Sequence, residues 1–291
     1  MKKLRWGEEL RFQLLTNAFL VIVLLIVLLP LWRVLVLSVT PFRHVDRSFG
    51  LLVSPSVWTF EAYSQFLSHP AFLHAFRNSL IITFGGVAIS LFMTVPMSYA
   101  YSIRTLPGRK ALNLFAMLPF LFNPGLIPSY LVVTGLGLQD NLLAVMLPPA
   151  VGIANMFIMR NFFQEIPQDL KEAARIDGAG ELFILMRIII PLSMPILLTI
   201  GLFYAVGHWN EFFTPLLYLN DAKLQPLPVL LRNILMAVNM NEYIEYDAFS
   251  SSSVQSLKAA SIFITMVPMM MAYPWIQKHF VKGSLAGGIK G

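Results

Sequence analysis

The sequence predicts an all-α integral membrane protein, and three observations indicate this fold class. The chain is 57% hydrophobic and only 12% charged, about half the charged fraction of an ordinary soluble domain. Six long stretches lack Asp, Glu, Lys and Arg, and each is long enough to cross a bilayer as a helix. These stretches show no alternation of apolar and polar residues of the kind that marks a membrane β-barrel, so we expect helices.

Charged residues bound the six uncharged stretches, and the transmembrane helices expected there form a single transmembrane domain over residues 1–291. A polar segment, residues 160–187, separates the fourth helix from the fifth. The first helix is rich in Leu, Val and Ile with little polar relief, so we expect it to face lipid at the periphery. The six expected spans are residues 12–36, 78–103, 111–133, 141–159, 188–210 and 259–277.

The distribution of Lys and Arg predicts the orientation of these helices. With the N-terminus in the cytoplasm, the inner segments carry twice as many Lys and Arg residues as the outer ones. The inner segments are also the shorter ones, so the positive-inside rule favours both termini in the cytoplasm. The net charge of +6 therefore indicates cytoplasmic loops rather than nucleic-acid binding. The first apolar run is long for a signal peptide and lacks its small-residue exit, so we expect an uncleaved helix.

The sequence lacks the motifs of several classes of catalytic, nucleotide-binding and metal sites. There are no cysteines, no phosphate-binding loop, no HExxH motif and no nucleophile elbow, and the His residues are dispersed. We therefore expect no catalytic residues and no metal site. The second to sixth spans have no charged residues in their interiors, whereas ion-coupled carriers commonly use intramembrane carboxylates. A channel for a polar solute, or a permease driven by another protein, fits this pattern.

The polar segment and the start of the fifth span predict a short surface helix joined to a spanning helix. Ile166-Pro167 favours a helix start, and Asp169 and Arg175 suit its positive and negative ends. Two alanines on one face would allow close approach by a partner. Gly178 provides a stop signal, after which a second amphipathic segment enters the membrane.

Two of the spans contain features that favour close packing or irregular backbone. Gly86, Ser90, Thr94 and Ser98 recur every four residues in the second span. This stripe indicates close helix packing, and a polar wall along a translocation path is the alternative. In the third span, Pro119, Pro124 and Pro128 interrupt any straight helix.

A small set of polar residues inside the expected spans could line a translocation path. Each could equally make a satisfied hydrogen bond between helices. Two long outer loops, about residues 38–77 and 211–257, are either solvated connections or surfaces that contact a partner. The path candidates are Asn123, Asn155, Tyr204 and Asn210.

One motif in the polar segment resembles a known family. Glu172-Ala173-Ala174, then Asp177-Gly178-Ala179, eight further residues and Ile188-x-Ile190-Pro191 resemble the EAA loop, EAAxxDGAx8IxLP, of ABC importer permeases. The one departure is Ile190 for Leu, which conserves volume. Other stretches are similar to the carbohydrate-uptake group: Asn78-Ser79-Leu80, Gly137-Leu138-x-Asp140, Trp209-Asn210-x-Phe212 and residues 283–291, the last similar to the second permease subunit of maltose-type importers.

This resemblance implies a type I ABC importer permease in the bacterial inner membrane. The implied partners are a second homologous permease, two cytoplasmic ATPase subunits and an extracytoplasmic sugar-binding protein. ATP and Mg²⁺ would be bound by the ATPase subunits, so we expect no cofactor in this chain. The coupling helix would dock in the ATPase through Glu172, Ala173, Ala174, Asp177 and Gly178. Lys171 and Arg175 are secondary docking candidates, for which a solvated position is expected.

The substrate is less well specified than the mechanism. The Pro-rich third span and the C-terminal tail look similar to a subgroup that serves larger oligosaccharides, including fragments of polysaccharides such as alginate. The outer segments carry nearly balanced charges, which gives no indication of an anionic substrate. The alternative function is a stand-alone secondary carrier or channel for a polar solute.

Overall fold

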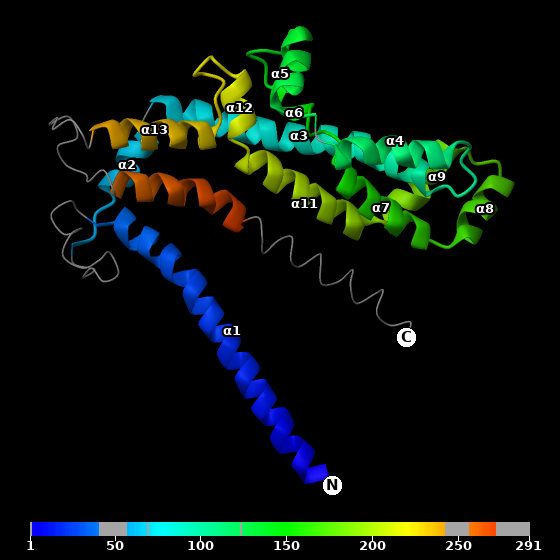
Figure 1. Cartoon of the computed structure of the whole chain (residues 1–291), viewed down its shortest axis with the longest axis horizontal. Coiled ribbons are helices and arrows are strands. Elements are labelled where there is room, and N and C mark those ends of the chain that lie inside the picture. Colours follow the sequence, from blue (N-terminus) through cyan, green and yellow to red (C-terminus); the bar gives the residue numbers. More distant parts are fainter. Residues whose placement is uncertain (1, 41–56, 69, 123, 242–255, 272–291) are drawn as a thin grey trace. The chain divides into compact units, whose positions relative to one another are not determined.

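The computed structural model describes residues 2–40, 57–68, 70–122, 124–241 and 256–271, and every regular element in these ranges is helical (Figure 1). The chain divides into two compact units. One contains residues 1–69 and 233–267, and the other contains residues 70–232 and 268–291. We describe each unit by itself.

The first unit is built on α1 (Lys2–Ser38), α2 (Glu61–Ser68) and the helix 256–271. Tyr63 of α2 connects the other two: its hydroxyl lies 2.7 Å from the Ser38 hydroxyl of α1, and its ring packs edge-on against Phe263. Residues 11–33 of α1 are all exposed. This exposure agrees with the expected lipid-facing helix.

The second unit is organised around α3 (Pro70–Ser102), along which α7 (Ile153–Glu165) and α11 (Met194–Asn210) pack (Figure 1). Their shared core contains buried aliphatic and aromatic side chains, among them Met159, Phe163 and Ile200. The shorter helices are α4 (Arg109–Leu121), α5 (Leu126–Gly135), α6 (Leu143–Met146), α8 (Gln168–Ile176), α9 (Glu181–Ile184), α10 (Ile190–Leu192) and α12 (Phe213–Tyr218), with a π-helical turn, η3 (Leu185–Ile189). The helix α13 (Leu227–Asn241) runs from the second unit into the first.

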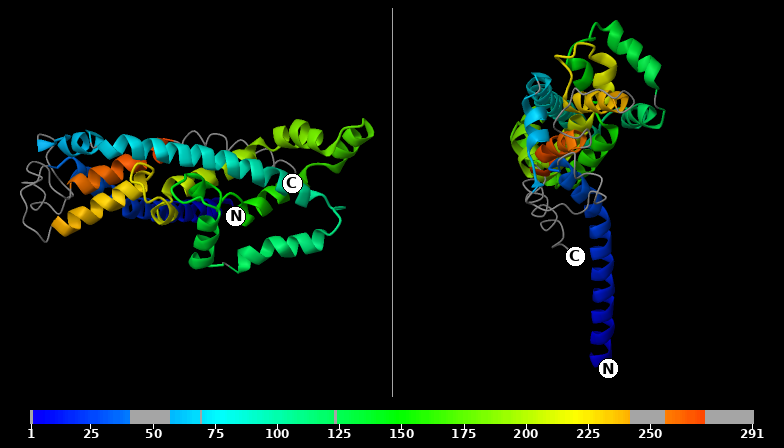
Figure 2. Two further views of the ribbon diagram at one scale, coloured as in Figure 1. Left: turned by 90° about the horizontal axis from the view of Figure 1, so that it is seen from above. Right: turned by 90° about the vertical axis from the view of Figure 1, so that its left-hand side faces the viewer.

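Within the described residues, two helices are individually long and apolar enough to cross a membrane: residues 11–38 of α1, and α3. Two further candidates are bent pairs. The helices α4 and α5 meet at 110°, which Figure 2 shows as a sharp turn, and this break falls at Pro124, inside the Pro-rich stretch. The stretch from α9 to α10 meets α11 at 85°. The count of six spans stays a prediction.

Two expected spans, residues 141–159 and 188–210, differ from the described helices. Residues 141–159 do not form one helix: α6 ends at Met146 and α7 begins at Ile153. The intervening Pro148 and Pro149 have no N–H group to donate, so a continuous helix cannot form there. Residues 188–210 are likewise interrupted at Ser193, which lies between two prolines. Of residues 259–277, the described part lies in the helix 256–271.

Candidate functional site

The predicted surface helix is present as α8, and its end is fixed by a glycine. Gly178 adopts a φ of +83°, a left-handed conformation that glycine tolerates best. Its N–H donates to the Arg175 carbonyl (3.0 Å), and the Ala179 N–H donates to the Ala174 carbonyl (2.9 Å). This pair of bonds is the Schellman arrangement, which satisfies the last carbonyls of a helix. The predicted stop at Gly178 is confirmed.

The predicted docking residues lie on α8 and in the turn that follows it, and we call this set the docking face: Glu172, Ala173, Ala174, Asp177 and Gly178. All are exposed except Ala174, which is half-buried against the core of the second unit. A groove of about 590 Å³ opens beside Ala174, Asp177 and Gly178, with Phe183 and Ile188 on its other side. The face therefore combines carboxylates, small residues and an adjacent apolar groove.

Exposed apolar side chains around this face were not predicted. Ile176 is 86% exposed, Leu182 is 73% exposed and Phe183 is 55% exposed. They flank the polar loop and would lose contact with water if another surface covered them. The signal for them in the sequence is that three apolar residues lie between the residues of a polar motif.

Lys171 is not solvated, so its expected position on a solvated face is wrong. Its side chain is buried, with only 7% exposed, and its Nζ donates to the Phe163 carbonyl at 2.9 Å. That carbonyl belongs to the last turn of α7, where helix carbonyls lack partners and a cation is favourable. Burial lowers the pKa of Lys171, with the nearby Arg175 adding to this effect. Lys171 thus connects α8 to α7 within the protein.

Arg175 is also engaged, although it remains exposed. Its Nε donates to Oε1 of Glu181 at 2.8 Å, and the other carboxylate oxygen of Glu181 accepts a hydrogen bond of 2.5 Å from the Tyr99 hydroxyl of α3. The hydrogen bond from Arg175, followed by that from Tyr99, lowers the pKa of Glu181. Glu181 therefore bridges α8 and α3, a role that sequence analysis did not assign.

The stripe of small residues on α3 packs against neighbouring helices. A Cβ atom placed on Gly86 would lie 2.5 Å from Nε2 of His208, so only glycine permits this approach. Thr94 hydrogen-bonds the Tyr204 hydroxyl at 2.7 Å, and Ser98 donates to the Met156 carbonyl at 3.1 Å. The packing interpretation of this stripe is confirmed.

The candidate path residues occupy different environments. Tyr204 is buried, and its hydroxyl accepts the Gly152 N–H at 2.9 Å. Asn155 is half-buried beside Gly152, whereas Asn210 is exposed and donates to the Val206 carbonyl of its own helix at 2.9 Å. Asn123 lies outside the described residues. Tyr204 lines a small cavity with His208 and Glu211, and a role for these residues in translocation stays a prediction.

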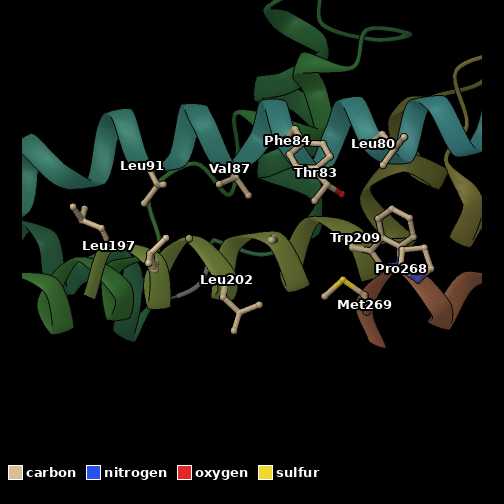
Figure 3. A pocket seen from close by; sticks show the side chains of 13 residues that line it. Leu80, Thr83, Phe84, Val87, Leu91, Leu197, Leu202, Trp209, Pro268 and Met269 are labelled. Atoms are coloured by element: carbon tan, nitrogen blue, oxygen red, sulfur yellow. The ribbon is translucent and has the colours of Figure 1, made fainter. Parts of the chain in front are cut away.

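A second cavity, of about 410 Å³, lies between α3 and α11 and is lined almost wholly by apolar side chains (Figure 3). Leu80, Val87 and Leu91 approach it from α3, and Leu202 and Trp209 from α11. With so few polar groups, it offers a sugar little to hydrogen-bond. Among the described residues, no cluster of three or more His, Asp or Glu side chains is arranged to hold a metal ion.

Comparisons with known proteins agree over most of the chain. Residues 7–284 match the family described as the binding-protein-dependent transport system inner membrane component. The polygalacturonan/rhamnogalacturonan transport system permease protein YtcP of Bacillus subtilis is 38% identical over 96% of this chain and 98% of its own length. Protein LplC of the same organism is 40% identical over 87% of this chain and 85% of its own length.

Solved structures agree with the sequence comparison. A chain from the crystal structure of a bacterial ABC transporter involved in the import of the acidic polysaccharide alginate has a TM-score of 0.85. It is 32% identical, and the match covers 92% of this chain and 96% of that one. The type I ABC permease fold is therefore shown, and the chain belongs to the family of binding-protein-dependent transport system inner membrane components.

Proposed function

We propose that this chain is a permease subunit of an ATP-driven importer that moves oligosaccharides into the cytoplasm by alternating access. A second, homologous permease completes the path. Two ATPase subunits bind and hydrolyse ATP with Mg²⁺, and an extracytoplasmic binding protein delivers the solute. This chain itself is non-catalytic. Six spans with both termini in the cytoplasm place the docking face on the same side as the ATPase subunits.

The observation that carries this proposal is the geometry of α8. A short helix held by a glycine stop presents two exposed carboxylates, two alanines and an adjacent groove, surrounded by exposed apolar side chains. Small residues allow a partner backbone to come close, and the apolar rim supplies area to bury when it does. A solvated connection would need neither feature.

The proposed substrate class is oligosaccharides derived from polysaccharides. Its support is the similarity to a permease named for polygalacturonan and rhamnogalacturonan, to a structure described for alginate import, and to the arabinooligosaccharides transport system permease protein AraQ of Bacillus subtilis, which is 26% identical over 96% of each chain. A panel of neutral and acidic oligosaccharides, tested for uptake with the cognate binding protein, would identify the preferred class.

The docking proposal is tested by reconstituting the complete transporter in liposomes with Glu172→Lys or Gly178→Pro. Reversing the charge of Glu172 should oppose docking. Proline cannot adopt the φ of +83° at Gly178, so the end of α8 should be lost. We expect both variants to insert normally but to lose most ATP-driven uptake and to retain less ATPase subunit during purification.

Glu165→Gln is the matched control, because Glu165 is an exposed carboxylate at the end of α7, outside the docking face. It should transport normally. Normal uptake by both docking variants would contradict the proposal. Uptake by this chain alone, with no ATPase and no second permease, would instead establish the alternative of a stand-alone carrier or channel.

A further inference from the structure

The docking face sits beside a set of polar contacts that the EAA motif does not include. We propose that Glu181 is a positioning residue that ties α8 to α3 through Arg175 and Tyr99, so that a displacement of α8 moves α3 instead of bending the loop. This inference rests on the proposed function, because it concerns how the motion of a docked α8 reaches a spanning helix.

The contacts meet on a single carboxylate. Its Oε1 accepts from Arg175 Nε at 2.8 Å and its Oε2 accepts from the Tyr99 hydroxyl at 2.5 Å. Arg175 lies in the last turn of α8, and Tyr99 lies near the end of α3. Glu181 begins α9, where a negative charge is also favoured by the helix dipole. Each carboxylate oxygen thus has a partner on a different helix.

The two partners differ in how firmly they are held. The Tyr99 side chain is only 5% exposed and packs in the core formed with α7 and α11. Arg175 is exposed and lies on α8, the helix that carries the docking face. Glu181 consequently connects the helix that carries the docking face to a residue buried in the core.

A direct contact between the helices is needed because the turn that joins α8 to α9 contains two glycines. Residues 177–180 connect α8 to α9 and include two glycines, of which Gly178 already has a left-handed backbone. Glycines permit large changes in backbone angles, so this turn could absorb a push on α8. Glu181 follows this turn, and it contacts both Arg175, which precedes the turn, and Tyr99 of α3.

Lys171 lies one turn before Arg175 on the same side of α8 and makes a second attachment. Its bond to the Phe163 carbonyl attaches α8 to α7, and α7 packs against α3. The helix α8 is therefore fixed at two points to one α3–α7 body. With only the Lys171 contact left, α8 could still pivot about that point, and Glu181 removes this freedom.

Variants can test this role without unfolding the protein, because an exposed ion pair contributes little to stability. Tyr99→Phe removes one hydroxyl from a buried ring, Arg175→Gln removes one charge, and Glu181→Ala removes the bridge. In the complete transporter we expect each to bind ATPase subunits normally but to import roughly threefold to tenfold less solute per ATP hydrolysed. Tyr99→Phe should cause no further loss in a Glu181→Ala background, because the contact is already broken.

A second measurement reports the geometry directly. The chain has no cysteines, so spin labels can be placed at Gln168→Cys on α8 and Phe92→Cys on α3, both exposed positions. In the complex assembled with cysteine-free partners, the parent should give one narrow distance distribution. Glu181→Ala and Tyr99→Phe should broaden it, and Glu165→Gln should not.

The outcomes separate this inference from the proposed function. If ATPase subunits fail to bind even the unaltered chain, the proposed function is wrong. If they bind, and all three variants keep the parental ratio of solute to ATP and the parental distance distribution, docking stands and the positioning role of Glu181 is overturned. A loss of protein in the membrane that lowers transport and ATP hydrolysis equally would also count against it, because that result indicates a purely structural role.

Discussion

Asp140 shows how one residue can fix the connection between distant segments. Among the described residues it is the non-glycine position with a positive φ, at 55°. Its carboxylate accepts the backbone N–H groups of Asn220 (2.6 Å) and Asp221 (3.0 Å), while its own N–H donates to the Tyr218 carbonyl at 3.0 Å. These bonds offset the cost of the unusual backbone and attach the turn before α6 to the segment after α12.

Replacing Asp140 with Ala should therefore destabilise the protein by about 1–2 kcal/mol, because alanine pays the left-handed penalty and provides no acceptor. Asp140→Asn is the matched control, since asparagine tolerates this backbone conformation and keeps an acceptor oxygen. Thermal unfolding of the protein in detergent micelles measures the difference. Equal melting temperatures for the two variants would show that the Asp140 carboxylate does not stabilise this junction.

At the scale of elements, the contact between α3 and α11 depends on which small residue faces which partner. Gly85 and Gly86 are adjacent, yet they meet different neighbours. A Cβ on Gly86 would lie within 2.5–2.7 Å of three atoms of the His208 ring, whereas one on Gly85 would lie 3.2 Å from the sulfur of Met146. The imidazole ring is rigid and buried, but a methionine side chain can change its rotamers.

We predict that Gly86→Ala destabilises the protein by about 1–3 kcal/mol through overpacking, and that Gly85→Ala is nearly neutral. Alanine has the higher helix propensity in both cases, so propensity cannot explain a difference of this sign. Unfolding temperatures of the two variants in the same detergent provide the measurement. A comparable loss in both would mean that the helices have room to separate at His208.

The sequence could predict those features of the site that depend on neighbouring residues, but not those that depend on contacts between distant segments. The end of α8 followed from Gly178, because the need for a left-handed residue after a helix is a local rule. The burial of Lys171 could not be predicted, because it depends on a carbonyl of a preceding helix coming within reach. The Tyr99–Glu181 contact joins residues 82 positions apart. Only the packing of α3 against the loop brings them together.

The positions of the apolar stretches could be predicted from the sequence, but only some of the bends within them could. Absence of charge located the apolar stretches, but it does not distinguish one straight helix from two joined at an angle. Pro148 and Pro149 were visible in the sequence, and the length of the uncharged run outweighed them. In the third span, proline signals and structure agree, because α4 ends at Leu121 and α5 begins at Leu126.

At the scale of the whole molecule, the described helices differ in where their apolar residues go. In α3 one set of residues is buried against other helices, as Ile82 is with only 1% exposed. In α1 the apolar residues of the middle turns are all exposed, with Leu25 at 60%. Lipid or a partner subunit would cover that surface, since no other described residue of the same unit buries it.

This difference gives a prediction about which hydrophobic residues hold the isolated chain together. Ile82→Ala should cost about 2–4 kcal/mol, because it leaves a cavity among packed side chains. Leu25→Ala should change stability by less than about 0.5 kcal/mol, because lipid or detergent fills the space that the smaller side chain leaves. Unfolding of the purified chain in micelles compares the two. Equal costs would place α1 inside the folded core, whereas a cost for Leu25→Ala that appears only in the assembled transporter would identify α1 as a surface covered by a partner subunit.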